Sequence, residues 1–444
     1  ARDPSMPSAV RSESFVRREF PSKIIGQLEN LRSRSIFTAL KRRELALAEA
    51  ERMEGGAGDS KPLFGLLFAV KDNIDVQGIP TTAGCPTFAY MPERSAKVVA
   101  RLEEAGAILV GKTNMDQFAT GLVGVRSPFG IAPNALRSDL IPGGSSSGSA
   151  VAVARGFVDF SLGTDTAGSG RIPAGMNGIV GLKPSLGLVS STGVVPACRT
   201  LDTVSIFSRD VDIAFRVLQV IAGYDPDDPF CSLAPSPVLE EPRPRPKVGV
   251  PAAAQRLFFG DEAAEAAFAA DLDMLQSLGF EVVEVDFEPF HAVARLLYEG
   301  PWVAERYAAI RSFIESNPSA LLPVTFSVIG PAKTITAVET FEAMYRLKAL
   351  KRQVEPVLQA LDCLAVPTIP RFYRISEIAE EPLAYNANLG TYTNFVNLLD
   401  LAAITLPVGL RNDGLPSSIT FIGPAGSDGL LAALALRVEN RPAR

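Results

Sequence analysis

The chain has 444 residues, a mass of 47.3 kDa and a formal net charge of −6. Its 47% hydrophobic and 21% charged residues are typical of a globular protein that holds one large domain or two to three average ones. The acidic balance argues against nucleic acid as a partner. No apolar run reaches the roughly 18 residues that a membrane helix needs, so we expect no membrane partner.

The four cysteines lie far apart in the sequence and form no CxxC pair. This spacing is typical of reduced thiols in a cytoplasmic protein and predicts neither a disulfide framework nor a zinc site. We therefore expect a cytoplasmic enzyme without a metal and without a cofactor.

Residues 1–60 are expected to form an N-terminal helical segment. Good helix formers fill the stretch from about Pro21 to Met53, and the breaker GGAG follows it. An apolar strand then ends at Lys71, and an amphipathic helix leads to a second buried strand near residue 110. The alternation of strands and helices continues through residues 149–177.

A proline-rich stretch at 235–246 is the strongest break in the chain and should be an extended connector. A second set of alternating strands and helices follows it to the end of the chain. We therefore predict an α/β fold over residues 61–444, with a large mixed β-sheet covered by helices on both faces. The connector is compatible with a subdomain boundary and equally with one sheet built from both halves.

Glycines and serines crowd two loops between residues 143 and 173, GGSSSGSAVAVARGFVDFSLGTDTAGSGRIP. Ser146 is central in a G-x-S-x-G pattern, but a polar stretch broken by Pro-Gly precedes it where a nucleophile elbow needs a strand. The only histidine is His291, in EPFHAV. GTDTAGSG lacks the Lys-Ser/Thr ending of a phosphate loop. These patterns argue against a Ser-His-Asp triad and against nucleotide binding.

Ser169 lies at the expected start of a helix, where free backbone amides make an oxyanion hole available. A serine nucleophile also needs a base. Lys71 ends an apolar strand, and burial there would lower its pKa enough to leave some neutral amine. From the residues alone, a solvent-exposed lysine at a strand end is an equally good interpretation.

The segments AVKDN, GGSSSGSA, GTDTAGSGRIPA and GIVGLKPS together resemble the amidase-signature family of serine hydrolases. The spacing agrees, with 74 residues from Lys71 to Ser145 and 24 from Ser145 to Ser169. The resemblance implies that Ser169 is the nucleophile, that Ser145 is a relay serine following a cis peptide after Gly144, and that Lys71 is the base. It also implies an oxyanion hole built from the backbone of three residues besides Ser169, namely Thr166, Ala167 and Gly168.

Within this family, VVPACRTLDTVSIFSRDV and LLYEGPWVAERYAAI resemble the allophanate hydrolases. Tyr298 and Arg306 stand eight residues apart, about two helical turns, and the resemblance implies that they hold a substrate carboxylate. The alternative is a surface helix on which Arg306 pairs with Glu299 or Glu305. Gly121 corresponds to backbone that lines the acyl pocket in relatives.

The resemblance implies hydrolysis of allophanate (urea-1-carboxylate) with release of ammonia in urea degradation, by a homodimer that takes a small anionic amide. The alternatives are a broad-specificity small-amide amidase and the glutaminase-type subunit of a tRNA-dependent amidotransferase. The latter usually has TDTGGSIRQP where this chain has TDTAGSGRIP. The C-terminal domain common in allophanate hydrolases is expected to be absent.

Overall fold

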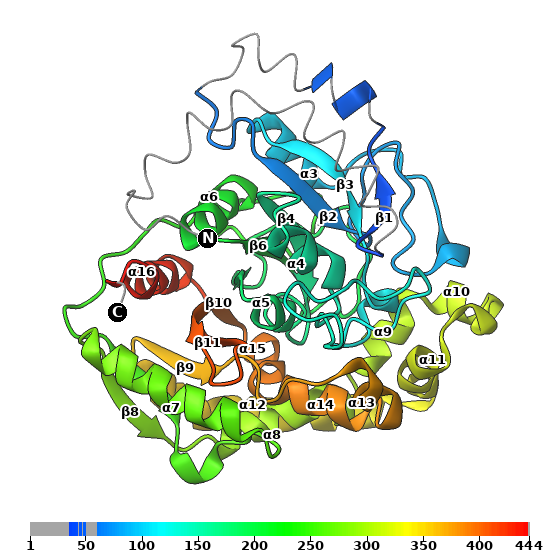
Figure 1. Ribbon diagram of the computed structural model, residues 1–444. Helices are drawn as coiled ribbons and strands as arrows, with labels where there is room; N and C mark the ends of the chain where they lie inside the picture. Colours follow the sequence, from blue (N-terminus) through cyan, green and yellow to red (C-terminus); the bar gives the residue numbers. More distant parts are fainter. Residues whose placement is uncertain (1–34, 43, 47, 50–59, 443–444) are drawn as a thin grey trace.

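A computed structural model describes residues 35–42, 44–46, 48–49 and 60–442. Eleven strands of the described chain form one sheet (Figure 1). In sheet order they are β1 (Phe37–Leu40), β3 (Ile108–Thr113), β2 (Leu67–Lys71), β4 (Phe160–Asp165), β6 (Thr203–Ser208), β5 (Val180–Lys183), β10 (Leu401–Leu410), β11 (Pro416–Pro424), β9 (Cys363–Pro367), β7 (Lys247–Pro251) and β8 (Glu281–Val285). β2 runs parallel to β3 and β4, and β7 runs parallel to β8 and β9, whereas the other pairs are antiparallel. The predicted mixed sheet is confirmed.

Helices cover both faces of this sheet. One face carries α3 (Lys97–Glu104), α6 (Val211–Ile221), α7 (Glu262–Ser277) and α16 (Asp428–Glu439). The other face carries α4 (Ser147–Ala154), α5 (Ile172–Asn177) and α15 (Asn394–Leu398), with α8 (Glu288–Glu299) packed against α15 and α12 (Ala337–Gln359) packed against α8. Five further helices are α9 (Val303–Ala309), α10 (Arg311–Ser316), α11 (Pro323–Ile329), α13 (Ile375–Glu380) and α14 (Ala384–Leu389).

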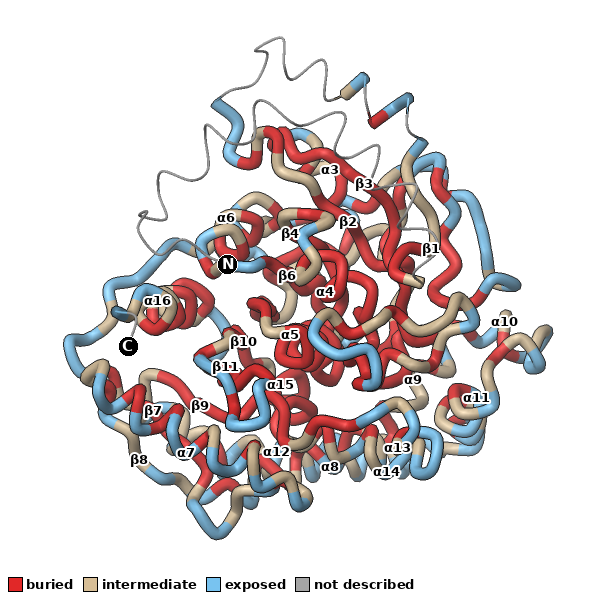
Figure 2. The backbone as a smooth tube through the Cα atoms, in the orientation of Figure 1, coloured by how far each residue is buried: buried red, intermediate tan, exposed pale blue. Residues whose placement is uncertain are grey.

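The sheet forms the centre of the buried core, and the exposed residues gather on the outer helices and loops (Figure 2). Phe68 on β2 and Phe160 on β4 are fully buried and stack with ring centroids 5.4 Å apart. Strands buried on both faces read as continuous apolar runs, which is why the sequence pattern revealed β2, β3 and β4.

The prediction of helix from Pro21 to Met53 is wrong at residues 37–40, which form β1. This strand pairs antiparallel with β3, and Phe37 lies opposite Thr113. Ile36 and Phe37 are buried, so the edge of the sheet offers them apolar contacts that override the helix propensity of their neighbours. These residues therefore belong to the main sheet. Much of the predicted N-terminal segment lies outside the described residues.

The proline-rich stretch 235–246 contains neither helix nor strand, as its composition predicts. It does not separate two sheets, because β7, which follows it, hydrogen-bonds to β9, and β9 pairs with β11. Both halves of the chain thus build one sheet. Within the described ranges, no helix is both long and apolar enough to span a bilayer.

Candidate active site

The carboxyl ends of β2 and β4 meet at one edge of the sheet because the two strands are parallel neighbours, with Val70 opposite Leu162. Lys71 is the last residue of β2, and Ser169 follows β4 in the turn before α5. Ser145 lies just before α4, which packs against β2 and β4. Three segments distant in sequence therefore converge here.

A continuous chain of hydrogen bonds joins the three predicted catalytic side chains. Lys71 Nζ donates to Ser145 Oγ at 2.7 Å, and Ser145 Oγ donates to Ser169 Oγ at 2.9 Å. The peptide bond between Gly144 and Ser145 is cis. Lys71 and Ser145 are fully buried and Ser169 is 3% exposed, which excludes the interpretation of Lys71 as a solvent-exposed lysine.

Burial lowers the pKa of the Lys71 amine to about 7. The buried carboxylates of Asp116, Asp165 and Asp202 oppose this effect, and the Arg306 guanidinium adds to it. A substantial fraction of the amine is therefore neutral near neutral pH, as a general base requires.

Thr164 is a contact of Lys71 that the sequence did not predict. Lys71 Nζ donates to Thr164 Oγ1 at 2.8 Å, and Asn73 Nδ2 donates to the same hydroxyl at 3.2 Å. When Thr164 accepts one N–H of the neutral amine, the lone pair of the nitrogen can face the Ser145 hydroxyl. Thr164 opens the TDTAGS motif, but nothing in the sequence places it opposite Lys71.

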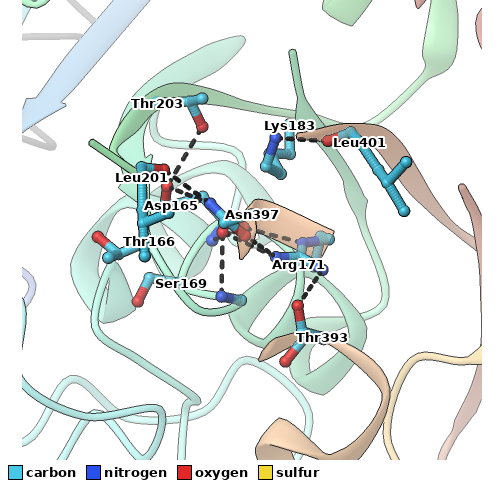
Figure 3. Close-up of polar contacts among 12 residues, drawn as sticks. Asp165, Thr166, Ser169, Arg171, Lys183, Leu201, Thr203, Thr393, Asn397 and Leu401 are labelled. Atoms are coloured by element: carbon cyan, nitrogen blue, oxygen red, sulfur yellow. Dashed lines mark hydrogen bonds and ion pairs between the residues drawn. The ribbon is translucent and has the colours of Figure 1, made fainter. Parts of the chain in front are cut away.

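A buried ion pair holds the loop that carries Ser169 (Figure 3). Arg171 donates from Nε and Nη2 to the two carboxylate oxygens of Asp165, at 2.9 and 2.8 Å. Burial alone would raise the pKa of Asp165, but the Arg171 guanidinium holds it below its usual value. The remaining donors of Arg171 reach the Thr393 carbonyl and Asn397 Oδ1, which ties the loop to α15 and the residue before it.

The same carboxylate accepts hydrogen bonds from the backbone on both sides of Ser169. Gly168 N–H donates to Asp165 Oδ1 at 3.0 Å and Gly170 N–H donates to Asp165 Oδ2 at 2.9 Å. The predicted oxyanion hole changes as a result, because the Gly168 amide already has a partner. Within the described chain, the amides of Thr166, Ala167 and Ser169 have no acceptor and remain available.

Gly168 must be glycine for two reasons. Its φ of +137° is a conformation that side chains disfavour, and a Cβ there would collide with the Thr393 side chain. The backbone conformation at Gly168 therefore depends on its contact with Thr393, which precedes α15, as well as on the local sequence.

Tyr298 and Arg306 lie close together, with the Arg306 guanidinium 5.7 Å from the centroid of the Tyr298 ring. Arg306 is 3% exposed and donates from Nη1 to the Ala119 carbonyl at 2.9 Å and to Thr120 Oγ1 at 3.3 Å. The surface alternative is excluded, since Glu305 instead accepts hydrogen bonds from Thr200. The structure therefore brings Arg306 to the loop that ends at Gly121.

Ser146 and His291 have structural contacts instead of catalytic ones. Ser146 Oγ donates to the Thr164 carbonyl at 3.2 Å. His291 lies on α8, packs against the rings of Phe287 and Tyr392, and has its Nε2 3.2 Å from the Gln255 carbonyl. The rejection of a Ser-His-Asp triad is consistent with these contacts.

A protein-family model described as Amidase matches residues 25–432, nearly the whole chain. The chain belongs to the amidase family. Its resemblance to amidase-signature enzymes is confirmed, and the buried Lys71–Ser145–Ser169 chain lies inside the matched region.

Several relatives within the family share much of this sequence. Saccharomyces cerevisiae urea amidolyase is 47% identical over 383 residues, which cover 85% of this chain and 21% of that protein. The chain spans about a fifth of the length of the urea amidolyases that it matches. A glutamyl-tRNA(Gln) amidotransferase chain of Synechococcus sp. is 35% identical over 427 residues, covering 89% of this chain and 87% of that one.

A solved structure of Kluyveromyces lactis allophanate hydrolase superposes with a TM-score of 0.89 at 41% identity. The match covers 96% of this chain and 71% of that chain. The fold of the amidase region is therefore shared, including the large mixed sheet.

The Asp165–Arg171 pair predicts a stability effect in this amidase. Arg171→Met should lower the free energy of unfolding by about 3–5 kcal/mol, because it leaves a buried carboxylate without its counter-charge. Urea denaturation of both proteins measures the difference. Arg295→Met removes an exposed arginine on α8 whose ion pair, among the residues that the structure describes, is with the exposed Glu288, and should leave the unfolding free energy nearly unchanged. Equal losses in the two variants would contradict the role given to the buried pair.

Proposed function

We propose that this amidase-family chain hydrolyses an amide with Ser169 as nucleophile, Ser145 as relay and Lys71 as base, and that its substrate is allophanate. The observation that carries the proposal is the hydrogen-bond chain Lys71–Ser145–Ser169, buried throughout and supplied with a base whose pKa is about 7.

The reaction begins when neutral Lys71 takes the proton of Ser145 while Ser145 takes that of Ser169. The freed Ser169 oxygen attacks the terminal carbonyl of the substrate, and the resulting oxyanion accepts hydrogen bonds from free backbone amides of residues 166–169. The same relay returns the proton to the leaving nitrogen, and ammonia departs. Water then cleaves the acyl-enzyme by the reverse route, and the carboxylated product loses carbon dioxide.

The carboxylate of allophanate is the feature that Arg306 would recognise. A planar guanidinium suits a small carboxylate, and the low dielectric of a buried site strengthens the attraction. Arg306 keeps its Nη2 side toward Tyr298, 3.5 Å from the phenol oxygen, so the two side chains can bind one anionic group together. The names of the relatives, urea amidolyase and allophanate hydrolase, support the same substrate.

The glutaminase alternative rests on the similarity to the glutamyl-tRNA(Gln) amidotransferases. Against it stand Gly170 and Ile172, where the glutaminase chains of those enzymes usually have isoleucine and glutamine. A Cβ at Gly170 would lie 2.5 Å from that of Ser205, so an isoleucine cannot enter here without moving β6. We retain allophanate as the proposed substrate.

We also propose that the chain forms a homodimer through α12. The outward side chains Val338, Phe341, Met344 and Tyr345 are 51% to 68% exposed. Glu339 and Glu342 lie in the first two turns of the helix, and Arg346, Lys348 and Arg352 follow them. An antiparallel α12 from a second copy would set opposite charges against each other beside the apolar stripe.

The free state of all four cysteines supports a reducing compartment such as the cytoplasm.

Replacing Ser169 with alanine should lower kcat/KM for allophanate by about a thousandfold or more, because the nucleophile is lost. In the unmodified protein, kcat/KM should fall by about tenfold per pH unit below pH 7, as Lys71 becomes protonated, and level off above it. Ammonia release measured from pH 5 to 9 checks both. Near-normal turnover by Ser169→Ala would disprove the mechanism.

Arg306→Gln should lower kcat/KM for allophanate by about thirtyfold, equivalent to roughly 2 kcal/mol, since the carboxylate loses its buried partner. Biuret, in which a neutral amide replaces that carboxylate, should be affected far less. Arg295→Gln on α8 is the control, because Arg295 is exposed and, within the part of the chain that the structure describes, forms its ion pair with Glu288. A preference of the unmodified protein for glutamine or for neutral amides would contradict allophanate as substrate.

Sedimentation equilibrium should give twice the 47.3 kDa mass of one chain. Phe341→Glu should shift the protein toward monomer, because it buries a charge in the apolar stripe. Leu410→Glu makes the same change at a position that is 77% exposed elsewhere on the surface, and should leave the dimer intact. A monomer at every concentration would rule out the dimer, and dissociation by both variants would rule out this interface.

A further inference from the structure

A second buried arginine, Arg126, lies against the same loop as Arg306. It is 3% exposed, and its Nη1 donates to the Thr120 carbonyl at 3.0 Å while its Nη2 donates to the Pro382 carbonyl at 2.7 Å. It belongs to none of the sequence motifs described above and has no part in the proposed mechanism.

Two guanidinium groups therefore enclose one short segment of backbone. Arg306 donates to the Ala119 carbonyl and to the Thr120 hydroxyl, and Arg126 donates to the Thr120 carbonyl. Gly121 follows directly, and a Cβ there would lie 2.9 Å from Asp116 Oδ2, 3.1 Å from Arg126 Cδ and 3.2 Å from Arg126 Nη1. The backbone that ends at Gly121 thus contacts two buried cations.

The nearest carboxylates accept hydrogen bonds from other groups and form no ion pair with these guanidinium groups in the described chain. Asp116 accepts hydrogen bonds from the amides of Gly124 and Arg126, and Asp202 accepts from Thr166 Oγ1 and the amides of Ala197 and Cys198. Across the residues that the structure describes, no carboxylate oxygen forms an ion pair with either guanidinium. Burial of a cation without a direct counter-ion is costly, and an anionic ligand would reduce that cost.

Arg126 also retains an unused donor. Its Nε is buried and has no hydrogen-bond partner. Two of its three nitrogens anchor backbone carbonyls, so the side chain is fixed in place and its charge has a fixed position relative to Thr120 and Gly121. Such a preorganised charge raises the affinity for an anion without touching it.

We propose that Arg126 is a positioning residue that determines specificity. It fixes the Ala119–Gly121 backbone jointly with Arg306, and it adds a second positive charge that selects a monoanionic amide over its neutral analogue. The inference rests on the proposed function, since it assumes that the carboxylate of the substrate lies beside Arg306.

Arg126→Gln removes the charge and keeps a hydrogen-bond donor, whereas Arg126→Lys keeps the charge and loses part of the anchoring. Arg126→Gln should lower kcat/KM for allophanate by about tenfold, mainly by raising KM, and change that for biuret by less than about threefold. Arg126→Lys should retain most of the preference for the anion. Arg137→Gln is the matched control, because Arg137 is exposed and pairs with Asp139.

Malonate binding to the Ser169→Ala protein gives a readout that needs no turnover. Calorimetry should show affinity about tenfold lower with Arg126→Gln and within about threefold with Arg126→Lys. Thermal unfolding of each variant reports whether the variant folds. If Arg126→Gln does not fold, a tenfold loss of malonate affinity in Arg126→Lys overturns the proposal.

Equal losses for allophanate and biuret, equal losses in both Arg126 variants, or no loss in either would also overturn it. Failure of the proposed function has a different signature. Ser169→Ala would then retain turnover, or the unmodified protein would favour biuret, and the latter result overturns the role of Arg126 as well. If Ser169→Ala retains turnover but the unmodified protein still prefers allophanate, the malonate affinities of the Arg126 variants continue to test the role of Arg126.

Discussion

The candidate active site depends on the ion pair and the hydrogen bonds that the buried Asp165 carboxylate forms. It receives two hydrogen bonds from Arg171 and one each from the amides of Gly168 and Gly170, so it fixes the backbone on both sides of Ser169. All of these groups are buried, and each unmade bond would leave a desolvated charge or amide. The position of Ser169 is therefore set by an ion pair that forms no hydrogen bond with the Ser169 hydroxyl in the described chain.

The network extends from this pair to the rest of the fold. Asn397 on α15 accepts from Arg171 and donates to the carbonyls of Asp165 and Leu201, and Lys183 at the end of β5 donates to the Leu401 carbonyl that begins β10. These contacts join segments more than 190 residues apart in sequence. A substitution at Asn397 on α15 would therefore disturb the loop that carries Ser169.

Electrostatic balance at Lys71 is the second consequence of burial. Desolvation would favour the neutral amine strongly, and the fields of Asp116, Asp165 and Asp202 limit that shift, which leaves the pKa near 7. Asp116 connects the two halves of the site. Its amide donates to the Ser145 carbonyl, and its carboxylate holds the backbone of Gly124 and Arg126. The Lys71 amine and the segment proposed to face the substrate are therefore both influenced by the buried Asp116 carboxylate.

Local sequence determined the catalytic segments, the strands buried on both faces and the spacing of Lys71, Ser145 and Ser169, because short motifs and apolar periodicity specify backbone conformation over a few residues. Only the tertiary structure decided what those segments meet. Residues 37–40 became a strand because β3 offered an edge, and the Gly168 amide is not free because it donates to the Asp165 carboxylate. Thr164 reached Lys71, and Arg126 reached Thr120, through the pairing of strands and the course of loops. Such contacts depend on which elements become neighbours, and a single sequence carries no local signal of that choice.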